Sequence, residues 1–175
     1  PLRLVGSEMC IRDRLRDLGS ALSPTNAFNF IQGLETLPIR YKKHQDNAEK
    51  VADFLTGKKN INRVIHPKYS LGLNKERAEK YLEDGNGPLV GFELDGGIEA
   101  GKTFIDNLEL IYHVANIGDA RTLAIHPAST THSQLSTEDQ LRAGVTPGYI
   151  RLSVGIEHID DIISVSYTHL RAHET

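Results

Sequence analysis

The sequence contains almost no cysteine, no tryptophan and no long hydrophobic run. One cysteine among 175 residues excludes an internal disulfide framework and suits a reducing compartment, so we expect a cytoplasmic protein. No apolar segment approaches the roughly 20 residues that a membrane-spanning helix requires. We therefore expect no part of the chain to enter a membrane.

Positive charge is also too scarce for a nucleic-acid-binding protein. The chain has 20 Lys and Arg against 23 Asp and Glu, a net charge of −3. Because nucleic-acid affinity rests on clustered positive charge, we expect no nucleic-acid partner. Hydrophobic residues make up 39% and charged residues 25%, which is enough to bury a core, and the length fits one ordinary domain.

The two ends of the chain mirror each other at the level of codons. Written as GTG GGC TCG GAG ATG TGT ATA AGA GAC, the segment Val5–Asp13 has a reverse complement that translates as VSYTHLRAH, which is Val165–His173. The string also resembles the translated adapter of transposase-based sequencing libraries. We therefore expect residues 1–14 and 165–175 to be adapter-derived and residues 15–164 to be an internal piece of a longer protein. The alternative is a genuine basic head and a His-containing tail.

Hydrophobic periodicity in the body predicts helices alternating with short strands. Ser23-Pro24 is a helix-start signal, and the spacing after it predicts one long helix, or two nearly collinear ones, with a kink or restart at Pro38 and an end at Gly57. Further helices are expected over Lys75–Leu82, Gly97–Leu108, Ser136 to about Ala143 and His158–Ile163. Strands are expected over Ile61–His66, Gly87–Leu94, Leu110–Ala115, Thr122–Ile125 and Tyr149–Gly155.

Several of these strands alternate apolar with polar residues, which is typical of a sheet covered on one face. The predicted fold class is therefore α/β of the α+β two-layer kind, with helices packed on one face of a small, mainly antiparallel sheet.

Arg151 is the residue best placed to bind a ligand. Within the predicted strand, Tyr149, Arg151 and Ser153 share one face, and the other face is apolar. A planar guanidinium in mid-strand binds a carboxylate through two parallel charge-assisted hydrogen bonds, which lysine cannot reproduce. The alternative is a surface arginine paired with Glu157 or another acid.

Two other groups of residues carry side chains that could form a site. The loop from Asn116 to Thr122 (NIGDART) carries amides, a glycine and a charge pair that suit a polar ligand site, although a bare connection between strands is the simpler interpretation. His126 and His132 fit no compact zinc motif, and Cys10 lies in the head of the chain, so no metal site is predicted.

Three long strings of the body resemble the C-terminal part of the Cys/Met-metabolism pyridoxal-phosphate enzymes. They are RDLGSALSPTNAFNFIQGLETL (Arg16–Leu37), HVANIGDARTLAIHPASTTHSQLS (His113–Ser136) and GVTPGYIRLSVGIEHIDDI (Gly144–Ile162). In the second string, Asn116–Asp119 replaces the Ser-Leu-Gly-Gly phrase of the lyase and cystathionine synthase branches. This replacement favours the sulfhydrylase branch, which exchanges the acetyl group of O-acetylhomoserine for sulfide or methanethiol in sulfur amino-acid biosynthesis.

The resemblance implies a fold and an assembly. The family has the aspartate-aminotransferase-like fold (PLP-transferase fold type I), in which a large cofactor domain precedes a smaller C-terminal domain. The long helix beginning near Ser23 would connect the two domains. Members are cytosolic homotetramers that use pyridoxal 5'-phosphate and act on a small amino-acid substrate.

The resemblance also assigns site residues. Arg151 matches the family's carboxylate-binding arginine in the string IRLSVGIE, Thr122 falls where relatives have a serine near the cofactor lysine, and Asn116 opens the replaced phrase. These three are the expected substrate-binding residues, and His132 is given no role. The Schiff-base lysine and the cofactor-binding residues are expected upstream of Leu15, so we expect no catalytic or cofactor-binding residue here and no activity from the fragment alone.

Alternatives remain inside and outside the family. Inside it are the cystathionine γ-synthase, cystathionine γ-lyase and methionine γ-lyase branches. Outside it are a non-catalytic amino-acid-sensing α+β module and a structural oligomerisation domain, both of which the composition and element pattern allow.

Overall fold

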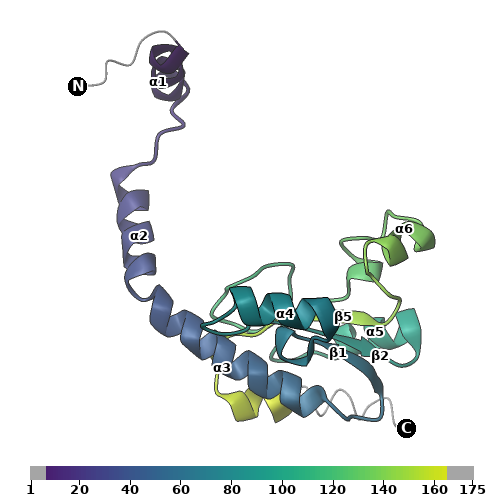
Figure 1. Cartoon of the computed structure of the whole chain (residues 1–175). Helices are drawn as coiled ribbons and strands as arrows, with labels where there is room; N and C mark the ends of the chain where they lie inside the picture. The colour runs from purple at the N-terminus through teal and green to yellow at the C-terminus, as the bar shows by residue number, and fades with distance from the viewer. Residues whose placement is uncertain (1–6, 165–175) are drawn as a thin grey trace. The chain divides into compact units, whose positions relative to one another are not determined.

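Short strands separated by helices build one five-stranded sheet in the chain (Figure 1). This computed structural model describes residues 7–164, so the whole of the predicted adapter-derived tail (residues 165–175) and the first six residues of the head lie outside the described part. The chain divides near Pro38 into two compact units, and each is described by itself.

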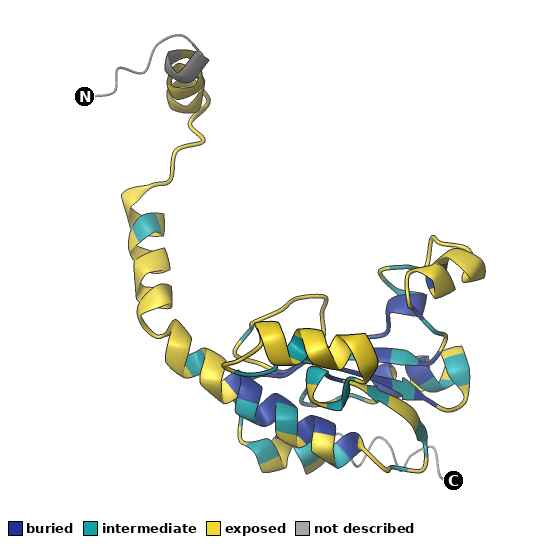
Figure 2. Ribbon diagram, in the orientation of Figure 1, coloured by how far each residue is buried: buried dark blue, intermediate teal, exposed yellow. Residues whose placement is uncertain are grey.

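The described residues of the first unit include the helices α1 (Ser7–Leu18) and α2 (Pro24–Glu35). Helix α1 runs across the boundary between residues 14 and 15, where the body was expected to begin. The predicted start signal of α2 is confirmed, since the Ser23 hydroxyl accepts a hydrogen bond from the main-chain N–H of Asn26 at 3.2 Å. None of the α2 residues is buried, and Figure 2 shows the helix exposed along nearly its whole length.

The second unit begins within α3 (Leu37–Leu55). Helix α2 has ended by Thr36, and α3 starts with Pro38 as its second residue, so the predicted restart at Pro38 is confirmed and two helices form rather than one. Proline fits the first turn of a helix because its missing N–H has no partner to lose there. Unlike α2, helix α3 buries one face, and its buried residues are His44, Gln45, Asn47, Ala48, Val51, Ala52 and Leu55.

The sheet is mainly antiparallel, as the strand patterns predict. Its strands lie in the order β1-β2-β5-β4-β3, and every neighbouring pair is antiparallel except β3 and β4. Their bounds are β1 Ile61–Ile65, β2 Leu89–Leu94, β3 Tyr112–His113, β4 Leu123–Ile125 and β5 Tyr149–Ser153. The strand predicted over Leu110–Ala115 shrinks to the two exposed residues of β3, because it lies at the sheet edge and pairs with β4 alone.

Four of the remaining helices fall close to the predicted positions: α4 (Gly72–Tyr81), α5 (Gly97–Asp106), α6 (Thr137–Arg142) and a closing helix over residues 159–164. The two short 3-10 helices η1 (Pro67–Tyr69) and η2 (Pro127–Ser129) were not predicted. Ser136 caps α6 as predicted, since its hydroxyl accepts from the main-chain N–H of Asp139 at 3.2 Å. No helix among residues 7–164 combines the length and the apolar character needed to span a membrane.

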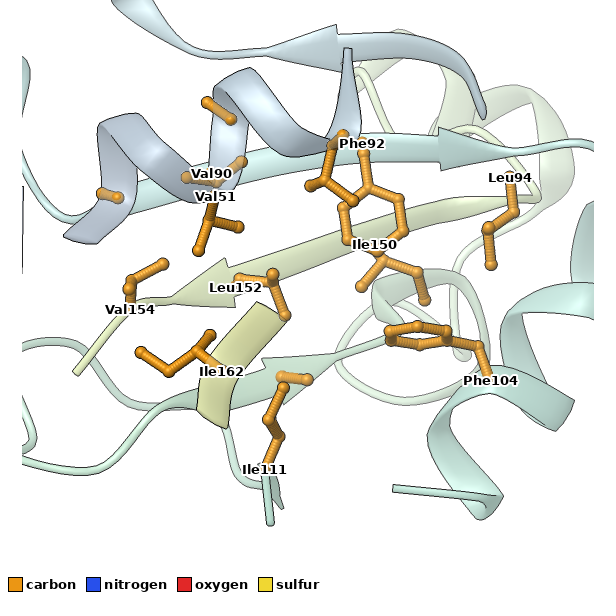
Figure 3. Packing of buried hydrophobic residues seen from close by; sticks show 14 of the residues in the cluster. Val51, Val90, Phe92, Leu94, Phe104, Ile111, Ile150, Leu152, Val154 and Ile162 are labelled. Carbon is orange, nitrogen blue, oxygen red and sulfur yellow. The ribbon is translucent and has the colours of Figure 1, made fainter. Parts of the chain in front are cut away.

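The hydrophobic core lies between one face of the sheet and the helices. Val90 and Phe92 of β2 and Ile150 and Leu152 of β5 point to the same side, where α3, α5 and the closing helix pack (Figure 3). The rings of Phe92 and Phe104 meet edge to face with centroids 5.5 Å apart. The predicted packing of helices on one sheet face is thus present, and the other face of β5 carries Arg151.

His126 joins α5 to the segment before β5. Its Nε2 donates to the carbonyl oxygen of Pro147 at 2.7 Å, so the ring proton is on Nε2, and Nδ1 lies 2.8 Å from the Ser129 hydroxyl. The ring is fully buried and lies against Gly101 of α5, where a Cβ atom would stand 2.4 Å from Nε2. Only glycine leaves room for this imidazole.

Replacing Gly101 by alanine tests that close approach. We expect Gly101→Ala to lower the free energy of unfolding by at least about 1 kcal/mol, because the overlap with His126 outweighs the helix propensity that alanine gains. Lys102→Ala, on the exposed side of the same helix, is the control and should change stability little. Chemical denaturation of both variants makes the measurement, and equal stabilities would contradict the packing argument.

His66 gives the fold a dependence on pH. Its ring is buried, Nδ1 accepts from the main-chain N–H of Lys68 at 3.3 Å, and Nε2 has no hydrogen-bond partner. Burial lowers the pKa of His66, and Lys68 lowers it further, while Glu49 and Asp53 act in the opposite direction. At pH values below the unfolded pKa of about 6.5 the unfolded chain therefore binds more protons than the folded chain. The free energy of unfolding decreases as the pH is lowered through this range.

We expect His66→Asn to flatten this pH dependence. Asparagine keeps an acceptor for the Lys68 N–H but does not titrate, so its free energy of unfolding should change less between about pH 7 and pH 5, where an unperturbed imidazole titrates. His113→Asn, at the exposed β3, should leave the dependence as it is. A parallel loss of stability in both variants and the parent chain would show that His66 contributes nothing to it.

Candidate functional site

A hollow of about 490 Å³ lies on the sheet face that carries Arg151. Its polar lining comes from Arg151 and Tyr149 of β5, Asn116 of the loop after β3, and Thr131 and His132 after η2. The apolar lining is Ala115, Ile117, Ile125, Pro127, Ala143 and Val145. The structure thus brings two of the three predicted site residues, Arg151 and Asn116, to one hollow.

The guanidinium of Arg151 has hydrogen-bonding capacity to spare. Its Nη2 donates to the main-chain carbonyl oxygen of Asn116 at 3.5 Å, the outer limit of a hydrogen bond. Its Nε is buried and has no partner. Within residues 7–164 no carboxylate forms an ion pair with it. The alternative interpretation, in which Arg151 is a surface arginine paired with Glu157, is therefore wrong.

The electrostatics of the hollow favour an anion. No Asp or Glu is among its lining residues, and Arg151 supplies a permanent positive charge. Burial raises the pKa of Tyr149, although Arg151 and Arg63 oppose the shift, so the phenol stays neutral near pH 7. A small ligand with a carboxylate or another planar anion meets a guanidinium that can bind two of its oxygens.

Tyr149 owes its position to a glycine on the neighbouring strand. On β2, a Cβ at Gly91 would stand 2.7 Å from Cε2 and 2.8 Å from the hydroxyl oxygen of Tyr149. Gly91 pairs with Arg151 in the β2–β5 register. The missing side chain therefore lets the Tyr149 ring cross to β2 and form a wall beside Arg151.

Thr122, the third predicted site residue, lies outside the hollow. It is fully buried, and its hydroxyl donates to Glu157 Oε2 at 2.9 Å and accepts from the main-chain N–H of Gly155 at 2.9 Å. Its own main-chain N–H donates to Glu157 Oε1 at 2.5 Å. Direct contact of Thr122 with a ligand stays a prediction, and its observed contacts are with the turn that follows β5.

Buried polar residues that the sequence reasoning missed support that turn. Asn47 Nδ2 donates to the carbonyl oxygens of Gly155 at 3.0 Å and Glu157 at 2.9 Å, and His44 Nδ1 donates to that of Val154 at 2.6 Å. His44 and Asn47 share the face of α3 that carries the apolar residues Ala48 and Val51. The sequence contains a signal for this role, because polar residues that lie on the apolar face of a helix need buried hydrogen-bond partners.

The residues that line the hollow do not form an anchor for pyridoxal phosphate. No lysine lines the hollow, so nothing there would bind an aldehyde covalently. Among residues 7–164 no three His, Cys, Asp or Glu side chains group in a way that would hold a metal ion. The partnerless Nε of Arg151 fits a carboxylate instead.

The fold and the hollow define a domain that carries an arginine side chain in a hollow, on the sheet face opposite the core helices. The profile of the family described as Cys/Met metabolism PLP-dependent enzyme matches residues 6–165. The chain belongs to this family, which confirms the resemblance.

Relatives from more than one branch of the family match the chain. The O-acetyl-L-homoserine sulfhydrylase of Leptospira meyeri is 57% identical over 150 residues, which cover 85% of this chain and 34% of that protein. O-acetyl-L-homoserine sulfhydrylase 1 of Thermus thermophilus is 48% identical over 86% of this chain and 36% of its own length. L-methionine gamma-lyase of Fusobacterium nucleatum is 43% identical over 86% of this chain and 38% of its own length.

A solved structure shares the fold. An O-acetylhomoserine (thiol)-lyase of Campylobacter jejuni, containing a pyridoxyl-lysine phosphate, superimposes with a TM-score of 0.82 at 40% identity, over 96% of this chain and 41% of that one. The chain therefore spans between about a third and two fifths of the length of these relatives.

Proposed function

We propose that this chain supplies the substrate-carboxylate site of an O-acetylhomoserine sulfhydrylase. The enzyme would replace the acetyl group of O-acetylhomoserine by sulfide or methanethiol, giving homocysteine or methionine and acetate. The observation that carries the proposal is the Arg151 guanidinium, whose buried Nε has no partner. The 57% and 48% identities to sulfhydrylases support the choice of substrate.

In this proposal Arg151 binds and orients the substrate. Two N–H groups of the guanidinium hold the α-carboxylate, and the Asn116 carbonyl, which now accepts from Nη2, keeps the fork in place. Pyridoxal phosphate, when bound by the longer protein, supplies the electron sink for bond changes at the substrate's Cα. The role of this chain is to fix the amino acid relative to that group, and Thr122 contributes through the residues that it supports.

The cellular setting of the enzyme is part of the proposal. We propose a homotetramer in the cytoplasm that acts on a small amino acid, with the lysine and the other cofactor ligands in the remaining part of the longer protein. We also propose that residues 1–14 and 165–175 derive from an adapter. The codon symmetry of the two ends supports this last point.

A second candidate is another branch of the same family. The 43% identity to an L-methionine gamma-lyase favours it, and a cystathionine gamma synthase of Xanthomonas oryzae shares the fold with a TM-score of 0.79 at 34% identity. Comparison of kcat/KM for O-acetylhomoserine, O-succinylhomoserine, cystathionine and methionine in the longer protein separates these branches.

Replacing Arg151 by lysine tests the proposed carboxylate site. In the longer enzyme, Arg151→Lys should lower kcat/KM for O-acetylhomoserine by at least about 30-fold, or about 2 kcal/mol, because an ammonium cannot make the two parallel hydrogen bonds. Arg77→Lys, on the exposed helix α4, is the matched control and should leave kcat/KM unchanged. Steady-state kinetics of both variants decide, and equal efficiencies would mean that Arg151 is structural.

The isolated chain should not bind pyridoxal phosphate covalently. Because no lysine lines the hollow, stoichiometric pyridoxal phosphate should produce no Schiff-base absorbance that borohydride fixes to the protein. Absorbance spectra before and after borohydride make the measurement. A single lysine labelled in stoichiometric yield would place a cofactor anchor within this chain and refute the prediction.

A further inference from the structure

The turn after β5 is held by side chains from two other segments. The residues Val154–Glu157 receive hydrogen bonds from His44 and Asn47 of α3, and Glu157 binds Thr122 just before β4. None of these side chains lines the hollow. They nevertheless connect the two segments that carry Arg151 and Asn116, since Arg151 precedes the turn and Asn116 precedes Thr122.

Glu157 and Thr122 form a closed set of hydrogen bonds. Both carboxylate oxygens of Glu157 are used, Oε1 by the Thr122 main-chain N–H and Oε2 by the Thr122 hydroxyl. The same hydroxyl accepts from the Gly155 N–H. A Cβ at Gly155 would stand 2.3 Å from Glu157 Oε2 and 2.5 Å from the carbonyl oxygen of Ala120. This arrangement of hydrogen bonds therefore requires a glycine at position 155.

Further hydrogen bonds connect the loop that carries Asn116 to β5 and to the turn after it. The main-chain N–H of Ile156 donates to the carbonyl oxygen of Ala120 at 2.9 Å, and that of Gly118 donates to the Ser153 hydroxyl at 3.4 Å. Ser153 lies two residues from Arg151 on the same strand face. The loop therefore rests on the strand that holds the guanidinium, and its far end is fixed by Thr122.

We propose that Thr122 and Glu157 are positioning residues for the amino-acid substrate. By tying the end of the 116–122 loop to the turn after β5, they set the distance between the Asn116 carbonyl and the Arg151 guanidinium. The distance from Arg151 Nη2 to the carbonyl oxygen of Asn116 is 3.5 Å. A small shift of the loop would therefore break this hydrogen bond and let the guanidinium change its orientation. The inference rests on the proposed function, because it assumes that Arg151 binds the substrate carboxylate.

The test compares two Thr122 variants in the longer, cofactor-loaded enzyme. Thr122→Val keeps the shape but removes the hydroxyl, which leaves Glu157 Oε2 and the Gly155 N–H without partners. We expect KM for O-acetylhomoserine to rise about tenfold with kcat within about twofold, because binding of the carboxylate is lost without a change in the reacting groups. Thr122→Ser keeps the hydroxyl and should restore KM to within about twofold of the parent.

If Thr122 only stabilises the fold, its variants should change the melting temperature and not KM. Gln45→Met is the control, since Gln45 is buried and donates to the Asp84 carbonyl oxygen at 3.1 Å, away from the hollow. It should lower the melting temperature without changing KM. If Thr122→Val does the same, or if Thr122→Ser raises KM as much as valine does, the positioning role is refuted.

Two further arms keep the outcomes distinct. If Thr122→Val does not accumulate as folded protein, Glu157→Gln replaces it, since it keeps one acceptor for the Thr122 N–H but loses the acceptor for the hydroxyl. An unchanged KM in that variant also overturns the proposal. An unaffected Arg151→Lys refutes the proposed function itself, whereas an impaired Arg151→Lys beside an unaffected Thr122→Val refutes the positioning role alone.

Discussion

A buried N–H of a charged group, left without a partner, costs a folded protein more free energy than most single contacts contribute. The Nε of Arg151 is such a group, and the surrounding structure explains how the fold tolerates it. Helices α3 and α5 and the closing helix pack on the opposite sheet face, so the strand that carries Arg151 belongs to the core and cannot move to satisfy one donor. We propose a substrate carboxylate as the partner of this donor.

The architecture around Arg151 consists of rigid supports. The glycine at position 91 lets Tyr149 lie beside the guanidinium, and the turn after β5 is tied to α3 and to the start of β4. Because these supports come from segments far apart in the chain, the site depends on the whole second unit. In the proposed function, the hollow contributes orientation and charge, and the covalent chemistry takes place in the remaining part of the longer protein.

The sequence allowed much of this to be predicted, and the limits have physical causes. Alternation along β5 was enough to place Arg151 and Ser153 on the face away from the core, because a strand has a fixed period of two. Thr122 was grouped with Arg151 by resemblance to relatives, whereas the structure uses its hydroxyl inside the fold. The roles of His44 and Asn47 depend on contacts across more than 100 residues of chain, which periodicity cannot show.

The most direct test of the carboxylate site is a crystal structure of the longer enzyme with an unreactive amino acid such as norvaline bound. The account predicts both carboxylate oxygens within hydrogen-bond distance of the Arg151 guanidinium, one of them accepting from Nε. An amino acid bound elsewhere, with Arg151 still in contact only with the Asn116 carbonyl, would contradict it.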